Sequence, residues 1–133
     1  MPVPLDLPDG SLLLRRLLKG TWAEQEQRPF SNSFELRLGI DTGLSVYLAA
    51  VTNEADILSG ITGAGLVALV YDEVKSCFDV FPSDGEENPA LAAGHVELRV
   101  RGLEQGSQIP RKKQRDLAKF AGAGLMVLPA SKV

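Results

Sequence analysis

The chain is poor in the residues from which reactive sites are usually built. Among its 133 residues there is one cysteine and one histidine. A single cysteine excludes an intrachain disulfide, and one cysteine with one histidine leaves too few ligands for a zinc site. Cys77 has Lys75 as its nearest basic neighbour along the sequence, which predicts no activated thiolate. We therefore expect neither a metal ion nor a cysteine nucleophile.

Long apolar runs and an excess of basic residues are also lacking. The longest apolar run, Leu66 to Tyr71, is far too short to cross a bilayer. The first ten residues lack the basic and apolar segments of a secretory signal. The net charge of −3 and the isoelectric point of about 5.1 argue against general nucleic-acid binding. We expect a cytoplasmic protein of bacterial type with no membrane partner.

What the chain does contain is typical of one globular domain. Apolar residues make up 44% and charged residues 23% of the sequence. A chain of this length buries roughly two-thirds of its unfolded surface, so it can fold without a disulfide or a metal. Three prolines among the first eight residues favour an extended segment over residues 1–10. We expect a single domain over residues 1–133.

A β-hairpin over residues 31–49 is the local structure that the pattern favours most. From Ser31 to Arg37, apolar and polar residues alternate as in a half-buried strand. Alternation resumes from Leu44 to Ala49, and Asp41-Thr42-Gly43 between the two runs is typical of a turn. The sequence therefore predicts two antiparallel strands joined at this turn.

The remaining pattern predicts an α+β fold. Its single domain would hold a mostly antiparallel, strongly bent sheet and two or three short helices. Further strands are expected at Leu66–Tyr71, Phe78–Pro82, His95–Val100 and Leu125–Leu128, and helices at Thr52–Leu58, Pro89–Gly94 and Arg111–Ala121. The run Leu12–Leu18 fits either a short helix or a buried strand, because periodicity does not separate the two at this length.

Candidate binding residues lie in the first half of the chain. Arg15 and Arg16 interrupt the leucines of Leu12–Leu18, and on a strand one of them would point inward, where an arginine needs a partner. Ser31 and Ser33 could hydrogen-bond a phosphate or a ribose. They equally fit a structural role in a turn or cap.

His95 and Glu97 are the candidates for proton transfer. On a strand they would share one face, and a histidine is the usual acid–base group near neutral pH. The alternative is that His95 is a solvated residue at the start of a strand. The basic run from Arg111 to Arg115 has no interleaved aromatic residues, and it is typical of a solvated helix face or a patch for an anionic partner.

Several short motifs resemble a set of small uncharacterised bacterial proteins. In those proteins an arginine-bearing strand precedes Pro-Ser-Ser-Ala-Phe-like, Leu-Ser-Val and Asn-Pro segments, then a histidine and an Ala-rich helix. The matching segments here are Leu14-Arg15-Arg16, Arg28 to Phe34, Leu44-Ser45-Val46, Asn88-Pro89, His95 and Leu117-Ala118-Lys119. This resemblance implies no known activity.

A second resemblance is to ADP-ribosyltransferase-like domains, including the RES-type toxins. Those domains carry an arginine or histidine on the first core strand, a serine or tyrosine on the second, and often a late glutamate. The matching residues would be Arg16, Ser33, Tyr47 and Glu97. The resemblance favours a strand at Leu12–Leu18, and it implies NAD as cofactor or substrate.

Two functions from different classes are therefore expected. The first is a non-enzymatic accessory or interaction domain whose partner is another protein, because the sequence offers few catalytic groups. The second is an NAD-handling enzyme of the ADP-ribosyltransferase type. In that enzyme Arg16, Ser31, Ser33 and Tyr47 would bind the cofactor, and Glu97 or His95 would be catalytic.

Overall fold

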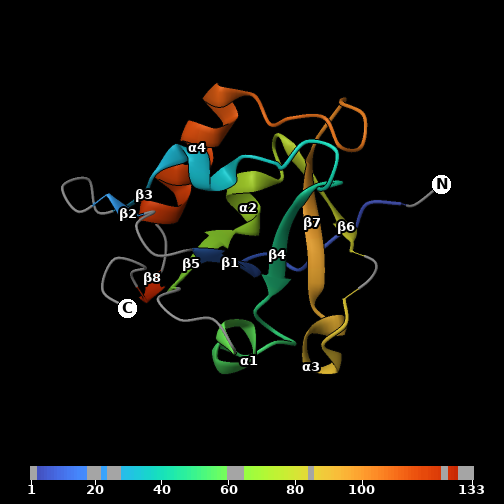
Figure 1. The fold of residues 1–133 in the computed structure, drawn as a ribbon, viewed down its shortest axis with the longest axis vertical. Coiled ribbons are helices and arrows are strands. Elements are labelled where there is room, and N and C mark those ends of the chain that lie inside the picture. Colours follow the sequence, from blue (N-terminus) through green and yellow to red (C-terminus); the bar gives the residue numbers. More distant parts are fainter. Residues whose placement is uncertain are drawn as a thin grey trace.

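The computed structural model describes residues 3–17, 22–23, 28–59, 65–83, 86–123 and 126–128. In this part of the chain, a six-stranded antiparallel sheet has the order β6-β7-β4-β1-β5-β8 (Figure 1). Helices lie against the sheet, and the expected α+β fold is confirmed. None of the described helices is long and apolar enough to cross a membrane.

The strands of the large sheet follow the predicted pattern closely. They are β1 (Leu12–Leu17), β4 (Leu44–Leu48), β5 (Gly65–Val70), β6 (Phe78–Pro82), β7 (His95–Val100) and β8 (Met126–Leu128). A separate two-stranded sheet pairs β2 (Trp22–Ala23) with β3 (Arg28–Pro29). The sequence allowed either a helix or a strand at Leu12–Leu18, and the structure has a strand there, over Leu12–Leu17. The predicted end residues Leu18 and Leu125 lie outside the described residues.

The described helices are short except for the last one. They are the 3₁₀ helix η1 (Ser31–Phe34) and the α-helices α1 (Glu54–Leu58), α2 (Tyr71–Val74), α3 (Pro89–Ala92) and α4 (Arg111–Ala123). Asn53 and Asn88 cap α1 and α3, because each side chain accepts a backbone N–H of the first turn. The helix α2 was not predicted. It begins at Tyr71, so the strand expected over Leu66–Tyr71 ends one residue earlier, at Val70.

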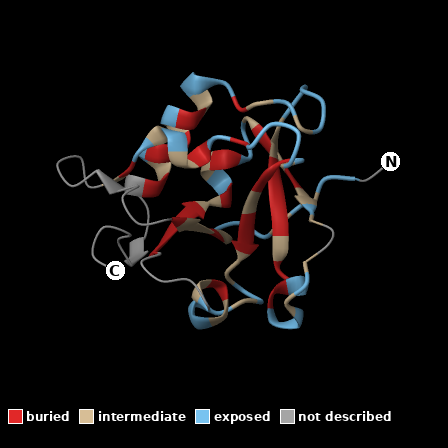
Figure 2. Cartoon of the chain, in the orientation of Figure 1, coloured by how far each residue is buried: buried red, intermediate tan, exposed pale blue. Residues whose placement is uncertain are grey.

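Two apolar clusters lie on opposite faces of the sheet, because side chains alternate along each strand. The larger cluster joins Leu13 and Leu17 of β1 to Leu117 and Ala121 of α4. The smaller one contains Leu14 and Tyr47 from the sheet, and Ile57 of α1 and Leu91 of α3. Figure 2 shows the buried residues along the central strands and the inner side of α4.

The predicted hairpin over residues 31–49 is wrong. Phe34 and Leu36 are buried as the alternation requires, but Ser31–Phe34 is a 3₁₀ helix and residues 35–37 belong to no strand. The Gln108 side chain takes the place of a strand partner. It accepts the N–H of Leu36 at 2.7 Å and donates to its carbonyl at 2.9 Å. Strand β4 pairs instead with β1 and β7.

The turn before β4 also lies earlier than the predicted Asp41-Thr42-Gly43. The chain reverses over residues 38–40, where Gly39 has a φ of 79°, a left-handed conformation that suits glycine. Asp41 closes this turn, because its carboxylate accepts the backbone N–H of Arg37 at 2.8 Å. An ion pair of 2.9 Å between the same two side chains adds to the closure.

Candidate functional site

A pocket opens where the neighbouring strands β1 and β4 separate. Leu13 pairs with Leu48 and Leu14 with Tyr47. The same register would place Arg15 opposite Val46, but the pairing ends at Leu14 although both strands continue. Polar groups that strand pairing would have occupied are therefore available to side chains at this point.

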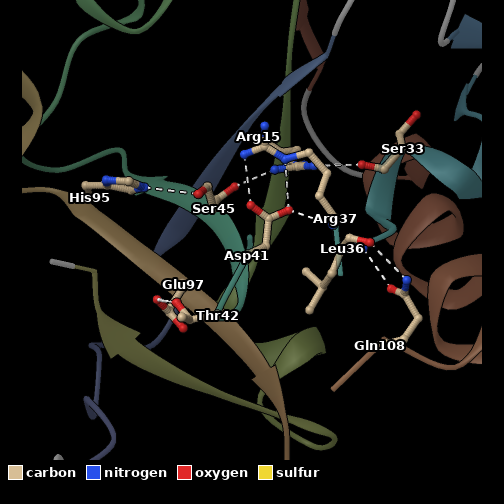
Figure 3. A network of polar contacts seen from close by, with 10 residues as sticks. All are labelled: Arg15, Ser33, Leu36, Arg37, Asp41, Thr42, Ser45, His95, Glu97 and Gln108. Carbon is tan, nitrogen blue, oxygen red and sulfur yellow. Dashed lines mark hydrogen bonds and ion pairs between the residues drawn. The ribbon is translucent and has the colours of Figure 1, made fainter. Parts of the chain in front are cut away.

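Arg15 fills the space between the separated strands. Its guanidinium donates to the carbonyl of Ser45 on β4 and to the carbonyl of Ser33 on η1, each at 2.8 Å (Figure 3). Burial lowers the pKa of Arg15 to about 10, although the nearby Asp41 carboxylate acts in the opposite direction. Arg15 thus stays charged at neutral pH and ties the 3₁₀ helix to the sheet.

Arg16 points to the opposite face of β1, towards Tyr47. One guanidinium nitrogen donates to the Tyr47 hydroxyl at 3.3 Å, and the guanidinium carbon lies 5.8 Å from the ring centre. Burial raises the pKa of the Tyr47 hydroxyl, while Arg16 acts to lower it. The two residues form one wall of the pocket.

His95 lies behind Tyr47 on the same face of the sheet. Their rings are stacked with centres 4.9 Å apart. Nε2 of His95 is 3.2 Å from the Ser45 hydroxyl, and Nδ1 is 3.1 Å from a Glu86 carboxylate oxygen without hydrogen-bond alignment. Burial lowers the pKa of His95 despite Glu86, so the ring is mostly neutral at pH 7.

The pocket itself has a volume of about 340 Å³ and an excess of positive charge. It is lined by three arginines, two carboxylates and three other residues: Arg15, Arg16, Arg37, Glu35, Asp41, Leu44, Ser45 and Tyr47. Arg37 hydrogen-bonds Asp41 and thereby lowers the pKa of that carboxyl. Among the described residues, no carboxylate lies within ion-pair distance of Arg15 or Arg16. Both also have a buried Nε without a hydrogen-bond partner there.

Glu97 shares the sheet face with His95, and neighbouring side chains hold its carboxylate. Its side chain accepts a hydrogen bond of 2.8 Å from the Thr42 hydroxyl and one of 2.7 Å from Arg99. Glu97 is only 4% exposed. A Cβ atom on Gly43 would come within 2.5 Å of its carboxylate, so the glycine makes room for it. Each carboxylate oxygen of Glu97 thus accepts a hydrogen bond from another side chain of the protein.

The structure divides the candidate residues into separate groups. Arg16, Tyr47 and His95 lie together, and Ser45 joins them although the sequence reasoning did not select it as a site residue. In the sequence, the alternation over Leu44–Leu48 puts Ser45 on the same strand face as Tyr47, and this pattern could have identified it. Ser33 lies at the other face, where its backbone binds Arg15 and its hydroxyl is buried without a partner among the described residues. Ser31 belongs to a different pocket beside α4.

A cysteine–lysine contact was not visible in the sequence. The Lys113 ammonium lies 3.0 Å from the Cys77 sulfur, although the two are far apart along the chain. Hydrogen bonds from Lys113 and then Ser76 lower the pKa of the Cys77 thiol. The described residues contain no group of three or more histidine, cysteine, aspartate or glutamate side chains that could hold a metal ion.

Comparison with known proteins identifies no relative of this chain. The chain matches no family model, no curated protein and no solved structure. The geometry of the pocket between β1 and β4 is therefore the basis for a functional assignment.

Proposed function

We propose that this protein is a non-enzymatic accessory domain that binds an anionic group, a phosphate or a carboxylate, in the pocket between β1 and β4. The observation that carries the proposal is the presence there of Arg15 and Arg16, which have no carboxylate partner among the described residues. Both arginines are half-buried, and withdrawing a cation from water costs free energy that a bound anion would offset.

The other lining residues suit the same ligand. The Ser45 and Tyr47 side chains offer hydroxyl groups to a bound oxyanion, and guanidinium groups bind carboxylates and phosphates with paired hydrogen bonds. His95 and Glu97 do not belong to the described lining of the pocket. This supports binding without turnover, and a partner protein is the expected source of the anionic group.

NAD handling is a second candidate, because Arg16, Tyr47 and His95 lie together on one face. The pyrophosphate of NAD would occupy the arginine pocket, and His95 would lie nearest to the reacting sugar. Two observations disfavour this candidate: Ser33 lies on the other face, and the Glu97 carboxylate is already hydrogen-bonded by Thr42 and Arg99.

Calorimetric titration with inorganic phosphate, citrate and NAD tests the proposal. We expect at least one anion to bind, and we expect Arg16→Gln to weaken its binding at least tenfold, which corresponds to about 1.4 kcal/mol. The matched control is Arg111→Gln, because Arg111 is an exposed arginine outside the pocket. Arg111→Gln should leave the affinity unchanged within about twofold.

The outcomes separate the two candidates. Binding of at least one of these anions, weakened by Arg16→Gln and without consumption of NAD, supports the accessory domain. Release of nicotinamide from NAD, abolished by Arg16→Gln, would favour the enzyme. Absence of binding to every anion, or equal losses in the two variants, would contradict an anion site at this pocket.

A further inference from the structure

A second pocket lies between α4 and the segment that joins β3 to η1. Its volume is about 430 Å³, and it shares no lining residue with the pocket between β1 and β4. The lining combines basic, apolar and hydroxyl side chains: Arg28, Lys112, Arg115, Lys119, Pro29, Phe30, Ala118, Ser31 and Asp116. We call this surface the α4 groove.

Positive charge follows the length of the α4 groove. Lys112, Arg115 and Lys119 are spaced by three and four residues, so they lie on one face of α4. Arg28 faces them from β3, and Asp116 is the single carboxylate of the described lining. None of these four basic residues forms an ion pair with a described carboxylate.

These charges are spread along the helix axis over a length that suits an extended chain better than a single small ion. From Lys112 to Lys119 the helix rises about 10 Å, with steps of about 4.5 and 6 Å between successive basic residues. Alternate residues of an extended peptide are about 6.6 Å apart on one side. A single small anion cannot contact all three positions, whereas a peptide with acidic residues at alternate positions can.

The groove also has an apolar element. Phe30 is 49% exposed although it is a large aromatic side chain, and the neighbouring Pro29 and Ala118 are buried. An aromatic residue next to cations suits an occupant that has both apolar and acidic side chains.

From these observations we propose that the α4 groove binds an acidic, extended segment of a partner protein. The acidic residues of the segment would pair with Lys112, Arg115 and Lys119, and an apolar residue between them would contact Phe30. A nucleic acid fits less well, because the whole chain has a net charge of −3 that repels a polyanion outside the groove.

The test uses a short fluorescein-labelled peptide that alternates glutamate and leucine, and a second peptide with glutamine in place of glutamate. Fluorescence anisotropy with the whole chain should show binding of the acidic peptide and at least tenfold weaker binding of the glutamine peptide. Arg115→Glu should weaken the acidic peptide at least tenfold, and Phe30→Ala several-fold.

Arg111→Glu is the matched control, because it makes the same charge change on the same helix outside the groove. It should weaken binding less than threefold. Equal losses for Arg115→Glu and Arg111→Glu would overturn the proposal in favour of unspecific electrostatic attraction. Tighter binding to a single-stranded RNA oligonucleotide or to vesicles of phosphatidylserine than to the acidic peptide would overturn it as well. Circular dichroism establishes that each variant is folded.

Discussion

At the scale of single residues, the two adjacent arginines of β1 have different roles. Arg15 donates two hydrogen bonds of 2.8 Å to backbone carbonyls from two elements, and it is buried enough for its pKa to fall to about 10. Arg16 makes one longer contact of 3.3 Å to a hydroxyl group. Arg15 therefore ties two elements together through two of its nitrogens, whereas among the described residues a single, longer hydrogen bond holds the Arg16 guanidinium.

This difference predicts unequal losses of stability. Arg15→Gln should lower the free energy of unfolding by about 2 kcal/mol, because it leaves two carbonyls without their charged donor. Arg16→Gln should lower it by at most about 0.5 kcal/mol. Urea denaturation of the two variants measures both values. Equal losses, or a larger loss for Arg16→Gln, would show that the division of roles is wrong.

Residue chemistry alone also explains why the candidate site was only partly predictable. Strand alternation correctly put His95 and Glu97 on one face and indicated that one of the two β1 arginines points inward. Sequence distance cannot show that Thr42 and Arg99 hydrogen-bond the carboxylate of Glu97. It also cannot show that β1 and β4 separate, which is what creates the arginine pocket.

At the scale of elements, the segment before β4 shows how burial alternation can occur without a strand. Phe34 and Leu36 point inward, so the polar and apolar pattern is that of a half-buried strand. Backbone pairing is decided by partners elsewhere in the chain, and here the partner is the Gln108 side chain. Local pattern specifies which side chains are buried and leaves the hydrogen-bond partners open.

The role of Gln108 gives a test at this scale. Gln108→Ala removes both hydrogen bonds to Leu36 and should lower the free energy of unfolding by about 1 to 3 kcal/mol. The Leu36 amide should also exchange its hydrogen faster, since its acceptor is lost. Gln105→Ala is the control, because Gln105 is exposed in the same loop. Unchanged exchange at Leu36 in Gln108→Ala would contradict the assigned role.

At the scale of the whole molecule, positive charge is concentrated although the chain is acidic. The chain has 14 basic and 17 acidic residues, yet three arginines line the pocket between β1 and β4, and four other basic residues line the α4 groove. An acidic chain with two basic concavities repels polyanions in general and attracts specific anionic groups locally. Both proposed sites would therefore select anionic groups.

The stability of the whole fold should depend on pH through its single histidine. Burial lowers the pKa of His95 below its ordinary value of 6.5, while Glu86 and Glu97 raise it and Arg16 lowers it. Between the lowered native pKa and the ordinary value of 6.5, the unfolded chain therefore binds more protons than the native chain, so the free energy of unfolding rises with pH in this window. The stabilisation is complete above the unfolded pKa and is lost as the pH falls.

Thermal and urea unfolding between about pH 5.5 and 7.5 measure this dependence, whose limit for one group is about 1.4 kcal/mol per pH unit. His95→Gln should flatten the profile in this range. Glu86→Gln should make it steeper, because the loss of a carboxylate 3.1 Å from the ring lowers the pKa of His95 further. Asp6→Asn, at an exposed carboxylate, should leave the profile unchanged. If the profile of His95→Gln is as steep as that of the original chain, the titrating group lies elsewhere. The lowered pKa assigned to the half-buried His95 beside Tyr47 would then be wrong.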